Sequence, residues 1–299
     1  MGDGIHAFFC PWGIEGRPIP QNPRSETAAM DLLLADIIQL LEDIAPPSLA
    51  EEWDNTGLQI GDPRSRVETV WVSLDPGPKV VAAACRSRVN LLVTHHPLFF
   101  RPVKRIDIQT PSGAIVAQAV RHRLAVYTLH TNLDAAVDGL NDLLARRLGL
   151  QRRRPLVPQR VVGDGRRHGL GRIGTLKRAR SLSELAREVK QRLGAEAVRM
   201  AGDPELRVKR VALSTGSGGG LVGEFLRTEA DVFISGDLRY HEVRDIEYAR
   251  RGAIDIGHFH SEHLMTAAIA QRLRRAFCRR HSRLRVEAFP HEKDPFTML

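Results

Sequence analysis

The sequence predicts an α/β protein, and two observations carry this prediction. Short apolar runs typical of buried strands alternate with stretches of helical period along the 299 residues. Three of the apolar runs lead directly into histidines or acidic residues. In open α/β sheets, ligands bind outside the carboxyl ends of the strands. These strand ends are therefore where we expect the functional site.

The first half of the chain is expected to hold most of one α/β domain. Residues 1–29 contain Gly, Pro and Asn without periodicity, which predicts a disordered tail. An amphipathic helix is expected over 31–44, where two prolines end it. Residues 51–61 have turn chemistry around a tryptophan and could lie near the functional site, but we favour a structural role. Strands are then expected over 67–74, from 91 and from 124, and helices over 79–86, near 114–121 and over 135–148.

The second half is expected to form another α/β domain. Residues 151–168 are rich in Arg and Pro and predict a linker, which places the two domains at 30–150 and 169–299. Ser181 and Glu184 form a capping box that should open a helix ending near Leu193. Strands over 208–213 and 231–236 follow, and a helix over 264–277 with a strand over 284–289 should close this domain.

The histidine pair at 95 and 96 is the first sign of chemistry. It follows the apolar run from Leu91, and Pro97 stops the strand directly after it. Side chains along a strand alternate between its two faces, so the pair should not chelate one ion in the simple way. At a strand end each imidazole could instead serve its own metal within one site. Because an isolated histidine pair is more often a hydrogen-bonded pair beside a turn, further ligands are needed.

Two other strand ends supply such ligands. Asp134 follows the run from Leu124, whereas His258 and Glu262 enter a helix with an i, i+4 spacing that places both on one side. Imidazoles and carboxylates together suit Zn, Fe or Mn. Five ligands are too many for one catalytic zinc with an open position. They suit two metals that share a bridging carboxylate.

Four motifs occur in order: THHPLFF at 94–100, HTNLD at 130–134, SGDLRYH at 235–241 and GHFHSE at 257–262. Together they resemble the Nif-three-like family of GTP cyclohydrolase I type 2-like, dinuclear metal-centre proteins, and the resemblance extends from about Met30 to the terminal Asp-Pro-Phe. It implies a chain start near Met30, two packed α/β domains, a homohexamer, and a two-metal site in the cleft between the domains. It also implies that Glu262 bridges the two metals and that the ligands are His95, His96, Asp134, His258 and Glu262.

Several polar residues near these motifs are candidates for other roles. The turn at 214–220 could present backbone N–H groups to a phosphate or could simply be a tight glycine turn. The family position favours a site-lining loop, so Gly216, Ser217, Gly218 and Asp237 are predicted to bind substrate. His241 is predicted to carry a proton. His130 is expected to support a ligand rather than to bind metal itself, and His260 and His263 are expected to face away.

Composition excludes some classes of protein. The fractions of hydrophobic (42%) and charged (26%) residues are those of a globular chain, and no apolar run approaches a membrane span. Three cysteines without metal or redox spacing, and a poor signal-peptide pattern, predict a cytoplasmic protein. The net charge of +9 invites a nucleic-acid partner, but aromatic residues (5%) are too sparse for a stacking platform. An arginine-rich surface, part of which could hold an anionic substrate, is the favoured interpretation.

The expected function is that of a two-metal hydrolase acting on a small molecule. If the family label applies, the substrate is GTP, and opening of its guanine ring releases formate. A phosphoester or another heterocycle is the alternative substrate. A metal-handling or regulatory protein without turnover is the rival from another class.

Overall fold

The computed structural model describes residues 31–159 and 165–298. The predicted tail at 1–29 lies outside the described residues. The prediction of an α/β fold is confirmed, because the described chain contains two sheets with helices packed against them. Among these residues, no helix combines the length and apolar character that crossing a bilayer requires.

The first sheet has five strands, of which four run parallel and β1 is antiparallel to its neighbour. Their spatial order is β1 (Gly57–Ile60), β4 (Ala125–Thr128), β3 (Leu91–Thr94), β2 (Thr69–Ser73) and β11 (Arg285–Ala288). Leu91 and Val93 face one hydrophobic core and Leu92 faces another, as the alternation of a strand requires. Both faces of the sheet are therefore buried, which explains the continuous apolar runs.

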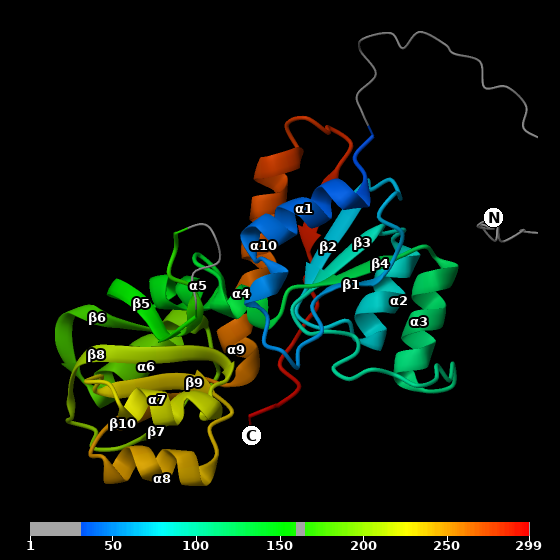
Figure 1. Ribbon diagram of the computed structural model, residues 1–299. Helices are drawn as coiled ribbons and strands as arrows, with labels where there is room; N and C mark the ends of the chain where they lie inside the picture. The colour runs from blue at the N-terminus through cyan, green and yellow to red at the C-terminus, as the bar shows by residue number, and fades with distance from the viewer. Residues whose placement is uncertain (1–30, 160–164, 299) are drawn as a thin grey trace, which may run out of the picture. The chain divides into compact units, whose positions relative to one another are not determined.

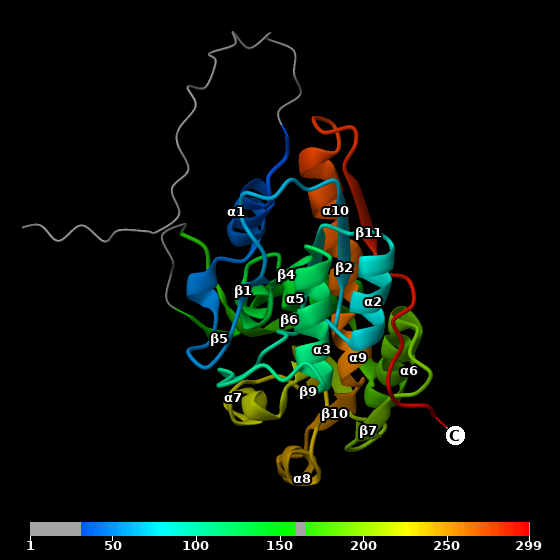
Figure 2. The ribbon, with the colours of Figure 1, turned by 90° about the vertical axis from the view of Figure 1, so that its right-hand side faces the viewer.

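Helices cover the two faces of this sheet (Figures 1 and 2). One face packs against α1 (Leu34–Ile44) and α10 (Leu264–Phe277), the other against α2 (Pro78–Arg86) and α3 (Pro111–Arg121). The last helix and strand were expected to close the second domain, and this was wrong. β11 pairs in parallel with β2, and α10 contributes Met265 and Ile269 to the core of the first sheet. The division of the chain into two separate domains stays a prediction.

The second sheet has six strands, of which β8, β9 and β10 are parallel. Their order is β5 (Gln151–Pro158), β6 (Gly169–Ser181), β8 (Arg207–Ser217), β9 (Val232–Gly236), β10 (Gly252–Asp255) and β7 (Arg199–Ala201). Its helices are α5 (Leu140–Arg147), α6 (Leu182–Leu193), α7 (Val222–Leu226) and α8 (Tyr240–Tyr248). The capping box of α6 is confirmed, because Ser181 Oγ accepts from Glu184 N and the Glu184 carboxylate accepts from Ser181 N.

Two stretches differ from the sequence prediction in secondary structure. Residues 151–158 were expected to be linker but form the edge strand β5. Charged side chains are tolerated there because an edge strand has a neighbouring strand on one side only. Residues 160–164 of the predicted linker lie outside the described part. The helix expected over 135–148 is split into α4 (Thr131–Ala135) and α5, because Asp138 has a left-handed φ of 60°. A side chain on Gly139 would collide with the backbone of Leu133, so the chain turns there.

Candidate metal centre

The two histidines at the end of β3 are held by different partners. The His95 side chain is fully buried, and its Nδ1 lies 2.7 Å from the carbonyl oxygen of Leu129. His96 Nδ1 lies 2.7 Å from Oδ1 of Asp75, which follows the neighbouring strand β2. Since a carbonyl oxygen only accepts, Nδ1 of His95 carries a proton, and in the neutral ring Nε2 has the lone pair.

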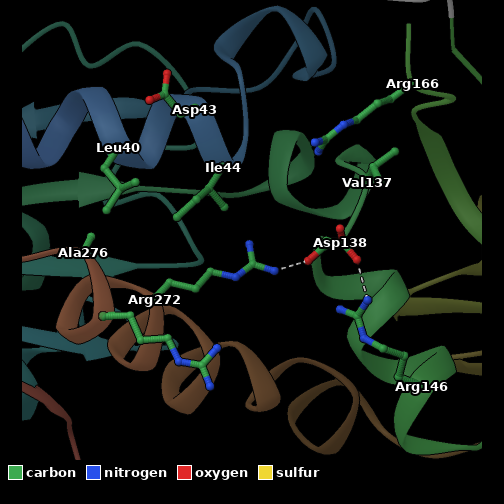
Figure 3. A pocket seen from close by; sticks show the side chains of 10 residues that line it. Leu40, Asp43, Ile44, Val137, Asp138, Arg146, Arg166, Arg272 and Ala276 are labelled. Carbon is green, nitrogen blue, oxygen red and sulfur yellow. Dashed lines mark hydrogen bonds and ion pairs between the residues drawn. The ribbon is translucent and has the colours of Figure 1, made fainter. Parts of the chain in front are cut away.

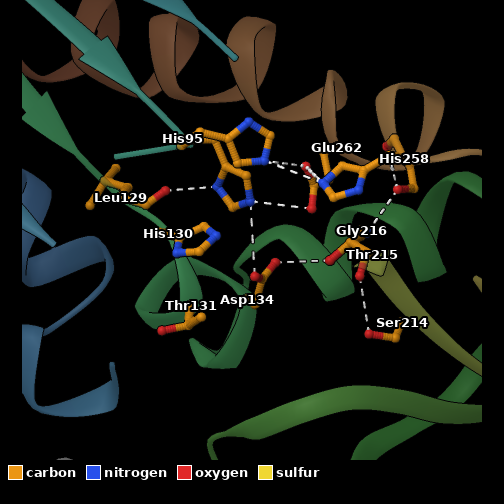
Figure 4. Close-up of polar contacts among 12 residues, drawn as sticks. His95, Leu129, His130, Thr131, Asp134, Ser214, Thr215, Gly216, His258 and Glu262 are labelled. Atoms are coloured by element: carbon orange, nitrogen blue, oxygen red, sulfur yellow. Dashed lines mark hydrogen bonds and ion pairs between the residues drawn. The ribbon is translucent and has the colours of Figure 1, made fainter. Parts of the chain in front are cut away.

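Glu262 lies between these histidines and a third one (Figure 4). It ends the short helix α9 (His258–Glu262), where the i, i+4 spacing brings its Oε2 to 3.0 Å from His258 Nε2. The same carboxylate lies 3.1 Å from His96 Nε2 and 3.4 Å from His95 Nε2. Glu262 is only 3% exposed. A single buried carboxylate therefore contacts three imidazoles from two sheets.

Asp134 completes the set from the third strand end. It lies on α4, and its Oδ2 is 3.9 Å from His95 Nε2. Its other oxygen accepts a hydrogen bond of 2.8 Å from the Thr215 hydroxyl, and Asn141 Nδ2 donates to its backbone carbonyl. The structure thus brings together all five residues predicted to bind metal.

His130 stands beside this group. Its Nδ1 lies 2.8 Å from Asp54 Oδ1, and its ring meets the rings of His95 and His96 edge-on at centroid distances of 5.2 and 5.8 Å. The other oxygen of Asp54 accepts from both the backbone N–H and the hydroxyl of Thr131. Asp54 therefore fixes the turn that carries His130, which gives residues 51–61 a place at the site.

All four imidazoles share one arrangement. Each Nδ1 lies against an oxygen: the carbonyl of Leu129 for His95, and a carboxylate of Asp75, Asp54 or Asp237 for the others. An imidazole held at Nδ1 in this way is the usual form of a metal-ligating histidine, because the second nitrogen is then free to bind.

The atoms left over are those of a metal site. His95 Nε2 and Glu262 Oε2 are buried, and their polar contacts among the described residues are with other members of the cluster. His96 Nε2 and His258 Nε2 face each other at 3.3 Å. In its neutral form each ring donates through Nδ1 to a carboxylate, so each Nε2 would carry a lone pair. Such lone pairs repel unless a cation or proton lies between them. Two groups have ligand atoms within 4.8 Å of one another, namely His95, His96 and His130, and His96, His258 and Glu262.

Charges within the cluster shift its pKa values strongly. Burial opposes the charged form of His96, but the carboxylates of Asp75 and Glu262 outweigh it and raise its pKa to about 10. Glu262 raises the pKa of His258 to about 9 against the effect of burial. Burial alone would raise the pKa of Glu262, but the surrounding histidines hold it well below its usual range. Asp134 differs, because burial raises its pKa and the neighbouring His95 only partly opposes this.

The glycine-rich turn approaches the cluster through one residue. Gly216 has a φ of 62°, and a Cβ there would lie 2.2 Å from Glu262 Oε1. Its N–H donates to Ser261 Oγ, and the N–H of Gly218 donates to the carbonyl of Gly236, so neither is directed at a ligand. Ser217 is exposed. These contacts explain the glycines by close packing, and the substrate-binding role of Gly216, Ser217 and Gly218 stays a prediction.

Asp237 contacts the histidine cluster in the structure, whereas His241 does not. Asp237 Oδ2 lies 2.8 Å from His258 Nδ1, so Asp237 orients an imidazole of the cluster. His241 is exposed on α8, where its ring packs edge-on against Tyr240. Among the contacts of the described residues, none joins His241 to the cluster. Its role as a proton carrier stays a prediction without structural support.

Two further histidines, His260 in the last motif and His263 directly after it, lie against the C-terminal segment. His260 Nδ1 lies 3.4 Å from Asp294 Oδ2, and His263 Nε2 lies 3.5 Å from Glu292 Oε2. Glu292 also accepts from the backbone N–H groups of Leu74 and Asp75. The C-terminal segment therefore fixes the turn that holds Asp75 against His96. Asp54, Asp75 and Glu292 were missed as site residues, although Asp75 follows a predicted strand directly.

Taken together, the two sheets bring imidazole nitrogens around one buried carboxylate. This defines a class of α/β protein with a cluster suited to divalent metal. A model of the Duf34/NIF3 (NGG1p interacting factor 3) family matches residues 32–295, so the chain belongs to that family.

Relatives and solved structures agree with this assignment. The chain is 32% identical to a "GTP cyclohydrolase 1 type 2 homolog" of Clostridium perfringens, over 89% of this chain and 99% of the relative. It is 35% identical to a protein of the same name from Streptomyces coelicolor, over 88% of this chain and 93% of that relative. A crystal structure of the hypothetical protein SA1388 of Staphylococcus aureus is similar with a TM-score of 0.82 at 28% identity, over 90% and 100%. A Bacillus cereus protein related to NIF3 has the same fold, with a TM-score of 0.84 at 24% identity over 90% and 100%.

Proposed function

We propose that this protein is a metal-dependent hydrolase that binds two divalent ions, Zn, Fe or Mn, through His95, His96, Asp134, His258 and Glu262. The observation that supports this most is the convergence of imidazole Nε2 atoms on the buried carboxylate of Glu262. Bound divalent ions supply Lewis-acid chemistry, which polarises the group under attack and makes water nucleophilic near neutral pH. One oxygen of Glu262 lies near His95 and the other lies near His96 and His258, which suits a bridging role.

The chain's own residues supply the proton chemistry in this proposal. We assign proton transfer to His130 rather than to His241, because His130 lies beside His95 and His96. Burial would raise the pKa of Asp54, but its hydrogen bonds with His130 and Thr131 lower that pKa to about 2. Asp54 therefore stays ionised at neutral pH and holds the His130 ring through Nδ1, which leaves Nε2 to take up or release a proton.

The substrate proposal is a small molecule with a guanine-type ring, namely GTP. It is supported by the name shared by the relatives. The reaction would be hydrolytic opening of the five-membered ring with release of formate, and Asp237 and the turn at 216–218 would lie near the substrate.

Metal-loaded protein should release formate from GTP, and the His130→Gln variant should lose on the order of a hundredfold in kcat while it keeps its metal. His241→Gln is the matched control and should keep kcat. Formate and bound metal would be measured on the same samples. A loss in His241→Gln with none in His130→Gln would reverse the assignment. Cleavage of a phosphoester in place of GTP would overturn the substrate but leave the metal site standing.

Metal uptake should release protons near pH 7.5. His96 and His258, with pKa values of about 10 and 9, carry protons in the metal-free cluster and must lose them to act as ligands. Apparent metal affinity should therefore fall as the pH falls and rise with pH until these groups are neutral. Titration calorimetry in buffers of different ionisation enthalpy measures the protons released. Uptake with no proton release would contradict the histidine assignment.

We also propose a homohexamer, which the family resemblance supports. Light scattering on the 33.3 kDa chain should then give about six times the monomer mass. A stable monomer at micromolar concentration would contradict this.

A further inference from the structure

Two adjoining hollows lie beside the turn between α4 and α5. One has a volume of about 710 Å³ and the other about 510 Å³, and Val137, Asp138 and Arg166 line both. Both volumes fall within the range of small-molecule sites, roughly 300–1,000 Å³. We call the two hollows together the arginine basin. None of the five proposed metal ligands lines either hollow.

The basin carries a large excess of positive charge. Nine arginines line it against three aspartates and no lysine, a surplus of six charges in a chain whose net charge is +9. Two of the aspartates are already engaged: Asp138 pairs with Arg146, and Asp142 pairs with the buried Arg172 at 2.9 Å. Even without Arg166, the arginines that line the basin outnumber its aspartates by eight to three.

Seven of the nine arginines come from three separate parts of the chain. Residues 152–154 belong to the edge strand β5, residues 166–167 precede β6, and Arg272 and Arg275 lie on α10. Burial lowers the pKa of Arg272, and the nearby Arg146 lowers it further while Asp138 opposes this. Cations crowded in this way repel one another, and a bound anion would relieve the repulsion.

The shapes of the two hollows differ. Leu40, Ile44 and Ala276 form an apolar wall on one side of the larger hollow, Val137 and Arg166 lie on the other side, and Arg272 extends between the two (Figure 3). The smaller hollow has few apolar side chains and mostly arginines. Guanidinium groups bind phosphate oxygens in pairs, which makes arginine the usual residue for such ligands.

We propose that the arginine basin binds a chain of linked phosphates carried by a small molecule, at a site separate from the metal cluster. The smaller hollow receives the phosphates, and the aliphatic wall of the larger one packs against any less polar part of the ligand. No aromatic side chain lines the basin among the described residues, so it lacks the stacking platform of a single-strand nucleic-acid site.

The test uses the full chain freed of metal with a chelator, so that its outcome does not depend on the proposed hydrolase function. Tripolyphosphate, GTP and orthophosphate are titrated separately by calorimetry at low and at moderate salt. Tripolyphosphate and GTP should bind, orthophosphate should bind much more weakly, and added salt should weaken all binding. If GTP binds more tightly than tripolyphosphate, the basin recognises a nucleotide. If the two bind equally, the basin recognises the phosphate chain alone.

The decisive variant replaces two exposed basin residues, Arg154→Gln with Arg275→Gln. Tripolyphosphate affinity should fall by roughly tenfold or more. The matched control, Arg178→Gln with Arg283→Gln, removes two exposed arginines that do not line the basin and should leave affinity unchanged. The proposal would be overturned if the two double variants bound tripolyphosphate with equal affinity or if binding required added metal. It would also be overturned if affinity for an oligonucleotide rose with the length of that oligonucleotide.

Discussion

Replacing Glu262 with glutamine is expected to remove most of the metal bound by the purified protein. The carboxylate contacts three imidazoles, and we propose that it shares two ions. Loss of a supporting partner of a metal ligand costs roughly 10–100-fold in affinity, so loss of this direct ligand should cost more. Elemental analysis after dialysis, and competition with a chelator, would measure the effect.

A matched control separates this effect from a general loss of carboxylate. Glu287→Gln changes an exposed glutamate of β11 that lies outside the cluster and should keep its metal. Equal metal content in the two variants would show that Glu262 is not a ligand.

Arg172→Met is expected to lower the free energy of unfolding by about 3–5 kcal/mol, as breaking a buried ion pair does. Arg172 is 2% exposed and donates to the carbonyls of Gly169, Gly171 and Ala136 and to Asp142. The variant leaves those acceptors buried without their partner. Chemical denaturation would measure the loss, and Arg178→Met, an exposed change on the same strand, should have little effect. A similar stability for both variants would contradict the structural role of Arg172.

The same pair has a pH signature. Burial alone would raise the pKa of Asp142, but its hydrogen bond with Arg172 outweighs this and lowers it. A depressed carboxyl pKa contributes stability above the unfolded value, near 3.9, and loses it as the pH falls through the folded pKa. The difference in stability between the wild-type protein and Arg172→Met should therefore shrink in acid.

The strands that carry the proposed ligands were predictable because their signals are local. Leu91 to Thr94 is a buried run that ends at a proline-stopped histidine pair, and His258 and Glu262 meet through helix spacing alone. That the three strand ends supply one site was predicted from the edge at which α/β sheets bind ligands, and the motif resemblance implied the same five residues.

Other features depend on which segments pair in space, and the pattern of one strand does not reveal its partner. The alternation of β11 is equally compatible with either sheet, so its pairing with β2 was missed. Charged residues at 151–158 look like a linker, yet an edge strand accepts them. Asp54 and Glu292 reach the cluster only because distant segments fold against it.

The central claim is that one buried carboxylate joins two divalent ions held by histidines from both sheets. Anomalous diffraction from crystals of the metal-loaded protein tests it most directly. The account predicts two anomalous peaks on opposite sides of Glu262, one near His95 and Asp134 and one near His258. A single peak whose coordination positions are all filled by protein, or no peak within reach of Glu262, would contradict it.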